Sequence, residues 1–519
     1  MTSASTLFRS VLIYSICLPL AVFLGYLLAT PMDYTTYIVV AVVLFLLASP
    51  LFLRWHHLWL IGAWNLGAVL FFLPGRPAPW MTMAALSLFI AVLQYILNRR
   101  LTFLYAPQVG RPLIFLAAVV LVTAKCNGGI GLGMLGSDMQ GGKRYIMLLG
   151  AIIGYFALTS QAIHPRRAGL CVALFFLGTV ANAVGELAPV IAPSLYFIFL
   201  LFPVSSEGMA SIMDAPGAAA SAGIVRLGGL AGASVGIVCA ILARHGIQQL
   251  FSLRRLLPLA MFLLFAIISM LGGYRSNLIL LLLTFAIVFY FEGLMRSRLL
   301  PIFIFLFVSA AALLVPLADR LPLSMQRTLS FLPIHVDPIA RRSAEDTTEW
   351  RLAMWKDILP QIPQYLILGK GYSFNVAEVN QINAVAGRSS EGAMEGAEVV
   401  GDYHNGPLSV ILPLGIFGVF GFLWFIVAAI RVLHQNYKFG PPEYRHYNTL
   451  LLAYFIARTM FFFAIFGSLY SDLFMFTGIV GLSISLNGGV AKPAPVPHPK
   501  IRFHAFKLQP AARRGMGAI

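Results

Sequence analysis

The stretch LLPIFIFLFVSAAALLVPL at residues 299–317 contains no charged side chain. An apolar segment of about 20 residues is long enough to cross the hydrocarbon core of a bilayer as a helix. A helix also pairs all of its backbone N–H and C=O groups internally, which an irregular segment in lipid cannot do. We therefore expect residues 299–317 to form a transmembrane helix.

Similar apolar stretches recur along almost the whole chain. We expect fourteen membrane-spanning segments: 11–29, 34–53, 57–74, 81–98, 113–130, 145–163, one crossing within 168–204, 227–243, 256–272, 277–294, 299–317, 407–432, 447–468 and 472–487. The region 168–204 is expected to hold one crossing and a re-entrant or surface piece near Pro189–Pro203. The first segment is interpreted as an uncleaved helix, because it lacks a small-x-small cleavage site.

The composition supports the same class of protein. Of 519 residues, 59% are hydrophobic and 11% are charged, whereas soluble domains contain about 25% charged residues. So little polar surface cannot enclose so large an apolar core in water, so lipid must be the other solvent. The sequence predicts an all-α polytopic integral membrane protein with about 14 transmembrane helices and one large outer loop.

The basic residues predict the orientation of these helices. Lys and Arg favour cytoplasmic loops, and the net charge of +17 is interpreted in this way. If both termini lie in the cytoplasm, the following basic residues are also cytoplasmic: Arg54, Arg99, Arg100, Arg166, Arg167, Arg244, Arg254, Arg255, Arg296, Arg298, Arg431, Lys438, Arg445 and those of the tail. No basic patch is interleaved with aromatic residues in a soluble segment, so no nucleic-acid partner is expected.

This topology divides the chain into four parts. Residues 1–317 form the N-terminal transmembrane helices, 318–406 the outer loop, 407–487 the C-terminal transmembrane helices, and 488–519 a basic cytoplasmic tail. The outer loop contains 11 of the 19 acidic residues. Within this loop, Leu352, Trp355 and Leu359 recur at helical spacing, which predicts a helix over roughly 347–360.

Three arginines depart from the expected pattern. Arg226 and Arg275 open two spans on the outer side, where positive residues are disfavoured. Each can be a lipid-phosphate anchor, but two arginines beside glycine-rich helix ends resemble an anion clamp, because Arg binds phosphate bidentately. Arg458 lies mid-span, at a cost of roughly 3 kcal/mol or more, so it must face the bundle interior. It can have a functional role or form a structural pair with an acid or with carbonyls.

His404 lies in the sequence Asp402-Tyr403-His404-Asn405-Gly406-Pro407, directly before a long span. Pro407 suits the first helical turn, with Asn405 or Gly406 as its N-cap. The positive end of the helix dipole disfavours imidazolium, so His404 is expected to be neutral and able to accept a proton. Asp402 can orient its ring. An ordinary loop histidine is the alternative interpretation.

These residues fall in motifs that resemble the bacterial O-antigen ligase/polymerase family. The stretch DYHNGPLSVILPLGIFG at 402–418 resembles the His-Asn motif of that family and its following Gly-x-x-Gly span. Four upstream stretches resemble other family segments, although the Asn-Pro-Asn-like residues often found after the first are missing here. They are RLGGL at 226–230, GYRSN at 273–277, RLAMW at 351–355 and LGKGY at 368–372.

The resemblance implies transfer of glycan from an undecaprenyl-diphosphate carrier to an acceptor hydroxyl, on the periplasmic face of the bacterial inner membrane. By this resemblance His404 is the catalytic base, and Arg226, Arg275 and Arg351 bind the diphosphate. The supporting residues are Asp402, Asn405, Trp355 and Arg458. No cofactor is expected, and no metal, since the outer loops contain no Asp-x-Asp or His/Asp cluster.

Several activities fit this resemblance. We favour an O-antigen or exopolysaccharide polymerase, because fourteen spans are more typical of polymerases; a ligase to lipid A-core or a protein O-oligosaccharyltransferase are alternatives. The acceptor glycan and membrane lipids are expected partners, with a chain-length regulator and a flippase as further ones. A lipid-linked sugar transporter is the rival from another class, but such proteins show two related halves, which are not evident here.

The topology can be tested with reporter fusions. A reporter fused near Gly387 should read as periplasmic, and one fused after Lys492 should read as cytoplasmic, because the basic loops orient the bundle. Paired alkaline phosphatase and green fluorescent protein fusions at both positions measure this. A cytoplasmic signal at Gly387 would contradict a reaction on the outer face.

Overall fold

The computed structural model describes residues 34–493 and a few isolated positions before them. Within that range it does not describe residues 74, 99–102, 105, 131–138, 192–193, 196–197, 204–223, 225, 253, 376–396 and 399. The expected span at 11–29 and the basic tail therefore lie almost wholly outside the described residues.

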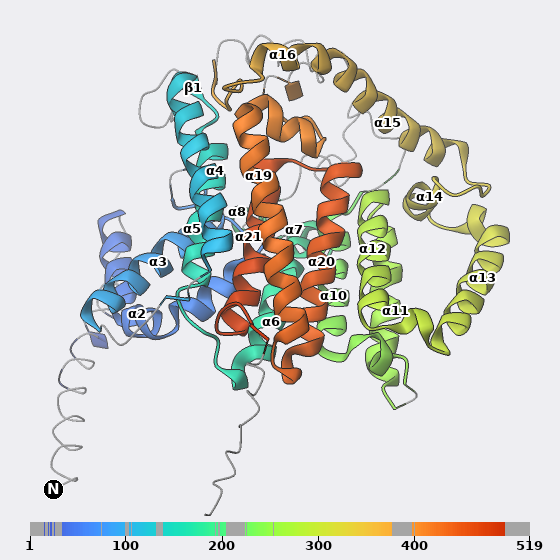
Figure 1. Ribbon diagram of the computed structural model, residues 1–519, viewed down its shortest axis with the longest axis horizontal. Helices are drawn as coiled ribbons and strands as arrows, with labels where there is room; N and C mark the ends of the chain where they lie inside the picture. Colours follow the sequence, from blue (N-terminus) through green and yellow to red (C-terminus); the bar gives the residue numbers. More distant parts are fainter. Residues whose placement is uncertain are drawn as a thin grey trace, which may run out of the picture.

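The described chain is mostly helical (Figure 1). The main helices are α2 (Tyr34–Ala63), α3 (Pro79–Leu97), α4 (Pro107–Cys126), α5 (Gly142–Leu158), α6 (Ala168–Leu177), α7 (Ala181–Ile191), α8 (Ile198–Leu201), α10 (Gly228–Leu250), α11 (Leu256–Leu271), α12 (Arg275–Phe291), α13 (Leu299–Leu317), α14 (Leu323–Leu329), α15 (Pro338–Ile358), α16 (Ile362–Tyr365), α19 (Gly406–Phe439), α20 (Arg445–Ala464) and α21 (Leu469–Leu486). Short 3-10 turns lie at Pro165–Arg167, Gly178–Val180, Leu294–Arg296, Ala318–Arg320, Leu359–Gln361 and Pro442–Tyr444. Strands β1 (Met139–Gln140) and β2 (Phe374–Asn375) form one antiparallel pair.

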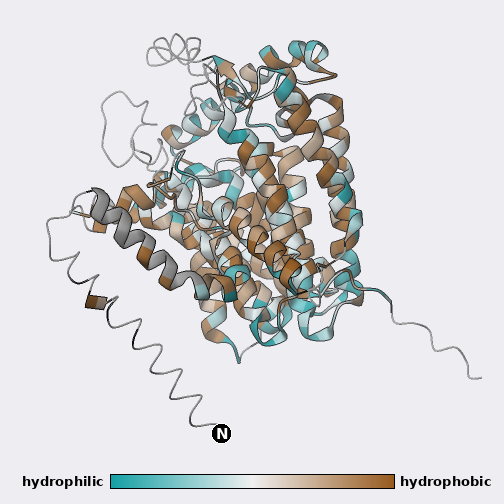
Figure 2. Cartoon of the chain, turned by 90° about the vertical axis from the view of Figure 1, so that its left-hand side faces the viewer, coloured by the Kyte–Doolittle hydropathy of each residue, from teal (hydrophilic) through white to brown (hydrophobic). Residues whose placement is uncertain are grey.

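Within the described residues, 8 helices are long and apolar enough to cross a membrane, and α11 and α12 are shorter apolar helices. These helices agree with the predicted class of protein, although they do not establish the number fourteen. The predicted segment 299–317 coincides with α13. Hydrophobic residues dominate the middle of the bundle, and hydrophilic residues are more frequent towards its two ends (Figure 2).

The predicted span at 57–74 is wrong. Helix α2 bends at Trp55 and ends at Ala63, and the described residues between 64 and 78 form no helix. This apolar segment stays irregular because other parts of the protein pair its polar groups. The Asn65 amide donates to the Phe175 carbonyl at 2.7 Å, and the Val69 N–H donates to the Leu201 carbonyl at 2.8 Å. Irregular backbone at membrane depth is tolerated where protein surrounds it.

The region 168–204 contains one candidate span, Pro165–Ala188, which includes α6 and most of α7. Glu186 near its end accepts hydrogen bonds from the N–H groups of Gly229 and Leu230, at 2.8 and 3.0 Å. This carboxylate therefore caps the first turn of α10, where unpaired N–H groups and the helix dipole favour a negative charge.

The core of the bundle lies where α5 packs against α21 and α4 packs against α19. Most side chains of α21 are buried, whereas α13 buries none of its side chains. Phe303 of α13 contacts the rings of Phe251, Phe285 and Phe289. Helix α13 is thus a peripheral helix whose apolar side chains face lipid.

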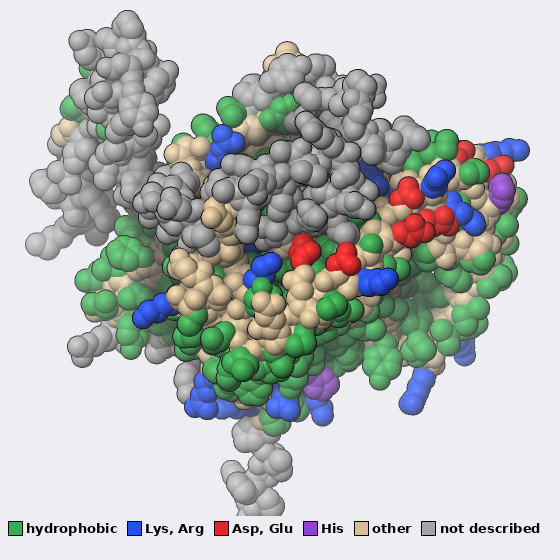
Figure 3. Space-filling model, turned by 90° about the horizontal axis from the view of Figure 1, so that it is seen from above, with side chains coloured by type: hydrophobic (Ala, Val, Ile, Leu, Met, Phe, Trp, Pro, Cys, Tyr) green, Lys and Arg blue, Asp and Glu red, His purple; other side chains and the backbone are tan. Residues whose placement is uncertain are grey.

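The described part of the segment between α13 and α19 forms a cap over one end of the bundle (Figure 1). The connections α5–α6, α10–α11, α12–α13 and α19–α20 lie at the opposite end, and they contain six of the basic residues expected to be cytoplasmic, namely Arg166, Arg167, Arg254, Arg255, Arg296 and Arg298. We call the end covered by α14, α15 and α16 the cap end. Seen from above, its described surface shows acidic and basic side chains interspersed (Figure 3).

The helix predicted at 347–360 is longer than expected. Helix α15 begins at Pro338, because the Asp337 side chain caps the N–H of Ile339. Met354 and Ile358 of this helix are fully buried, while Leu352 and Leu359 are more than half exposed. The apolar spacing indicated a helix but not which of its faces would be buried.

A break in α19 ties the cap to the bundle. Gly415 adopts φ +63° and ψ −164°, which interrupts the helix two residues after Pro413. The segment 366–371 enters this break: the N–H groups of Lys370 and Gly371 donate to the carbonyls of Leu412 and Pro413, and Ile416 N–H donates to the Leu366 carbonyl. The distances are 2.7, 3.0 and 2.7 Å. The groups that the break exposes are therefore paired.

Gly415→Ala should destabilise the protein. A Cβ at this position would lie 2.4 Å from the Ile367 carbonyl oxygen, at a positive φ, so we expect a loss on the order of 2 kcal/mol or more. Thermal unfolding of purified protein in detergent measures the loss. Gly232→Ala in α10 is the control, because a Cβ there meets nothing within 4 Å. Equal melting temperatures for the two variants would contradict this assignment.

Candidate functional site

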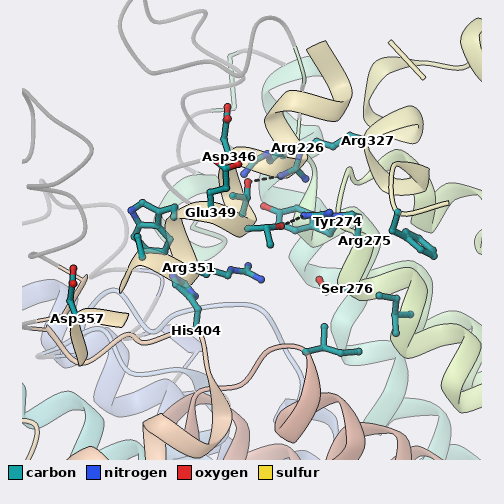
Figure 4. Close-up of a pocket in the computed structure, with 17 residues that line it drawn as sticks. Arg226, Tyr274, Arg275, Ser276, Arg327, Asp346, Glu349, Arg351, Asp357 and His404 are labelled. Atoms are coloured by element: carbon teal, nitrogen blue, oxygen red, sulfur yellow. Dashed lines mark hydrogen bonds between the residues drawn. The ribbon is translucent and has the colours of Figure 1, made fainter. Parts of the chain in front are cut away.

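A cavity of about 1100 Å³ lies at the cap end, between α15 and the ends of the membrane helices. Its lining comes from segments far apart in sequence: Arg226, Tyr274, Arg275, Ser276, Ile279, Arg327, Phe331, Asp346, Thr347, Thr348, Glu349, Trp350, Arg351, Ala353, Asp357, His404 and Ile465. The structure therefore brings Arg226, Arg275, Arg351 and His404, four of the residues singled out in the sequence, to one cavity (Figure 4).

Three arginines form one wall of the cavity, and α15 holds them in place. Arg275, the first residue of α12, donates to the Ala344 carbonyl at 2.7 Å and to the Thr348 hydroxyl at 3.1 Å. Arg226 donates to the Ser343 hydroxyl at 3.4 Å. The outer loop thereby fixes side chains that begin two different membrane helices.

Arg327 is the third of these arginines, and no sequence pattern marked it as a candidate. It lies in α14, is 4% exposed, and donates to Ser343 Oγ and Thr347 Oγ1, each at 3.1 Å, and to the Gly273 carbonyl. Ser343 thus accepts from both Arg226 and Arg327. A lone arginine in a polar loop has no pattern that distinguishes it from a surface residue.

The charges of this wall suit an anion. The guanidinium groups of Arg226 and Arg275 are close enough to repel each other, and Glu345 offsets that repulsion only in part. Arg226 donates to a hydroxyl, and Arg275 donates to a hydroxyl and a carbonyl, and none of these three groups carries a negative charge. A diphosphate would supply that charge and accept bidentate hydrogen bonds.

His404 lines the cavity, directly before α19. As predicted, Asn405 is the N-cap, and its side chain accepts from the Leu408 N–H at 3.1 Å. His404 has φ +48°, and its ring lies between those of Trp350 and Phe466, with centroid distances of 5.5 and 5.3 Å. This packing fixes the imidazole at the cavity wall.

Two neighbours of His404 affect its chemistry. The Asp402 carboxylate lies 3.8 Å from Nδ1 of His404, close enough to stabilise a positive charge on the ring. Burial, reinforced by the charge of Glu398, raises the pKa of Tyr403. The Tyr403 hydroxyl therefore stays protonated at neutral pH and does not compete with His404 as a base.

Arg351 and Trp355 lie one turn apart on α15 but contact different groups. The Arg351 guanidinium lies 5.3 Å from the centroid of the Phe466 ring and lines the cavity. The Trp355 indole N–H donates to the Tyr403 carbonyl at 2.8 Å. Trp355 therefore holds the backbone beside His404, while Arg351 faces the same space as the histidine.

The structure places Arg458 away from the residues that line the cavity. Its guanidinium lies 3.3 Å from the Asp472 carboxylate, which corresponds to the structural pair considered in the sequence analysis. Asp472 also accepts from the Ser468 N–H at 2.9 Å. The pair therefore stabilises the turn between α20 and α21, which contains Phe466.

Among the described residues, no group of three or more His, Cys, Asp or Glu side chains is placed to hold a metal ion. The described cysteines are unpaired: Cys171 and Cys239 are buried, and Cys126 is exposed. The polar groups that converge on the cavity are therefore guanidinium, imidazole, hydroxyl and carboxylate groups.

Comparison with known proteins agrees with this site. Residues 259–423 match the family model described as O-antigen ligase, which confirms the resemblance to the O-antigen ligase/polymerase family. The match covers α11 to the middle of α19, and so includes Arg275, Arg327, Arg351 and His404. No curated protein matches the chain.

Trp355→Ala should loosen the backbone beside His404. The substitution removes the hydrogen bond to the Tyr403 carbonyl and the contact between α15 and the start of α19. We expect amide hydrogen exchange in residues 400–405 to rise at least severalfold. Hydrogen–deuterium exchange with mass spectrometry measures this. Leu352→Ala is the control, since Leu352 is 55% exposed, and equal exchange in both variants would contradict the role given to Trp355.

Proposed function

We propose that the protein transfers glycan from an undecaprenyl-diphosphate carrier to a sugar hydroxyl at the cap end. The observation that supports this most strongly is the single cavity that joins the Arg226–Arg275–Arg327 wall to His404. The family match adds that membrane glycan transfer of the O-antigen ligase/polymerase type is the activity to expect of residues 259–423.

In the proposed reaction, the three arginines bind the carrier diphosphate. The acceptor hydroxyl attacks the anomeric carbon, and its proton passes to His404. The bond from that carbon to the phosphate oxygen breaks, and the diphosphate leaves with the bonding electron pair. The arginines stabilise the charge that develops on the leaving group, and Asp402 stabilises the imidazolium. Attack from the face opposite the diphosphate inverts the anomeric centre.

Arg351, Trp355, Asn405 and Arg458 have supporting roles in this proposal. Arg351 lies between the arginine wall and His404 (Figure 4), where it can bind a phosphate or a sugar oxygen. Trp355 and Asn405 fix the turn that presents His404. Arg458 acts at a distance, through Asp472 and the turn that contains Phe466. No metal or cofactor is required by this proposal.

We further propose that the chain is a polysaccharide polymerase of the bacterial inner membrane, with both termini in the cytoplasm. A ligase to lipid A-core or to protein would use the same residues, because the activities differ in the acceptor and not in the leaving group. A chain-length regulator and a flippase remain proposed partners. The cap end is then periplasmic, in keeping with the basic connections at the other end of the bundle.

Arg275→Lys should fail to restore the activity that Arg275→Ala loses. Lysine keeps the charge, but it cannot donate simultaneously to Ala344, Thr348 and a phosphate in the planar geometry of a guanidinium. We expect at least a tenfold loss of transfer in the Lys variant. Purified protein with lipid-linked glycan in proteoliposomes measures this. Full activity in the Lys variant would show that charge alone suffices.

His404→Gln should be as inactive as His404→Ala. Glutamine can hydrogen-bond a sugar but cannot accept its proton, and general-base catalysis contributes roughly 10²–10⁴-fold. Both variants should still bind the lipid-linked donor, because the arginine wall is intact. Single-turnover assays and donor-binding assays measure the two steps separately. A Gln variant with most of the wild-type rate would make His404 a binding residue.

A further inference from the structure

One face of α15 lines the cavity along several turns. Asp346, Trp350, Ala353 and Asp357 all line it, at spacings of four, three and four residues, which place side chains on one side of a helix. From Asp346 to Asp357 this row extends over roughly 16 Å, at about 1.5 Å per residue. We call it the α15 row.

The ends of the cavity differ in charge. In Figure 4, Arg226, Arg275 and Arg327 lie on one side, Arg351 and His404 lie in the middle, and Asp357 lies on the far side. The Asp357 carboxylate thus lies beyond His404 as seen from the arginine wall. Asp346 and Glu349 also lie beside Arg226, so three guanidinium groups outnumber two carboxylates on that side, whereas the labelled charged group on the far side is the Asp357 carboxylate. An anionic ligand is therefore favoured on the arginine side and disfavoured beside Asp357.

Side chains of the α15 row suit a sugar. The Trp350 ring lies 5.5 Å from the His404 ring, and an indole offers a flat apolar face for the C–H groups of a pyranose. Asp357 is exposed to the cavity, and a carboxylate accepts hydrogen bonds from hydroxyl groups but donates none. Ala353 between them is small, so it leaves open space on the row.

The geometry points to an acceptor site along the α15 row, in which Trp350, Ala353 and Asp357 bind the sugars that precede the reacting hydroxyl. This inference rests on the proposed function, because it takes the arginine wall as the donor side. An acceptor that attacks opposite the diphosphate must approach from the Asp357 side of His404. The carboxylate selects neutral or amino sugars over acidic ones.

Kinetics can separate this role from donor binding. Asp357→Asn should raise the KM for the acceptor about tenfold, since a hydrogen bond to a charged group is being weakened. The KM for the donor and kcat should stay unchanged. Asp319→Asn is the matched control, because Asp319 is an exposed aspartate of the same loop that does not line the cavity. An unchanged acceptor KM, or a raised donor KM, would overturn the assignment.

Photo-crosslinking in the native host tests occupancy without any assay of transfer. A small diazirine amino acid at position 353, in a His404→Ala background, should crosslink to carbohydrate, which periodate and hydrazide labelling detects on the purified protein. The same amino acid at position 352, whose Leu side chain is 55% exposed and does not line the cavity, should not. Adding Arg275→Ala should leave the crosslink, since the acceptor does not use the arginine wall.

These outcomes distinguish the two proposals. A crosslink at 353 that depends on Arg275 would assign the row to the donor and overturn the acceptor site. No crosslink at 353, or equal labelling at 352 and 353, would also overturn it, even where wild-type transfer depends on His404. A crosslink at 353 in the labelled variant, found together with no glycan transfer by the wild-type protein, would support the sugar site and contradict the proposed function.

Discussion

The pairing of backbone groups at the break in α19 is the constraint on which the arrangement of the site depends. A membrane helix interrupted at Gly415 must find partners for its exposed carbonyls and N–H groups, because lipid supplies none. Residues 366–371 of the outer loop provide them. This junction anchors the loop just beyond the end of α15, and the Trp355–Tyr403 hydrogen bond anchors α15 a second time beside His404. His404 and the loop are therefore positioned by the same helix.

The placement of charged side chains in the cavity follows from the position of α15. Residues 343–348 of α15 hold Arg226, Arg275 and Arg327 through hydroxyl and carbonyl groups. Two turns further along, the same helix presents Asp357. In the proposed reaction, this one helix therefore orders the diphosphate and the acceptor sugar, with His404 between them. A leaving diphosphate and an incoming hydroxyl require this order in the proposed reaction.

Much of the helical architecture was predictable, because lipid-facing segments such as 299–317 must be apolar along their whole length. The same rule failed at 57–74, where apolar residues form buried irregular backbone rather than a span. For the site, sequence pointed to Arg226, Arg275, Arg351 and His404, because each lies in a recognisable local setting. Arg327 has no such setting, and its place depends on tertiary contacts with Ser343 and Gly273. Which face of α15 is buried could not be predicted, because Met354 and Ile358 meet their partners on α19 only in the folded protein.

The central claim is that the arginine wall and His404 act on one ligand. The most direct measurement is a cryo-EM structure of the His404→Ala protein in a nanodisc containing undecaprenyl-diphosphate-linked glycan. The account predicts phosphate density within hydrogen-bond distance of Arg226 and Arg275, with the first sugar directed towards position 404. Density for the diphosphate at the basic end of the bundle, or in the cavity with its sugar directed away from position 404, would contradict it.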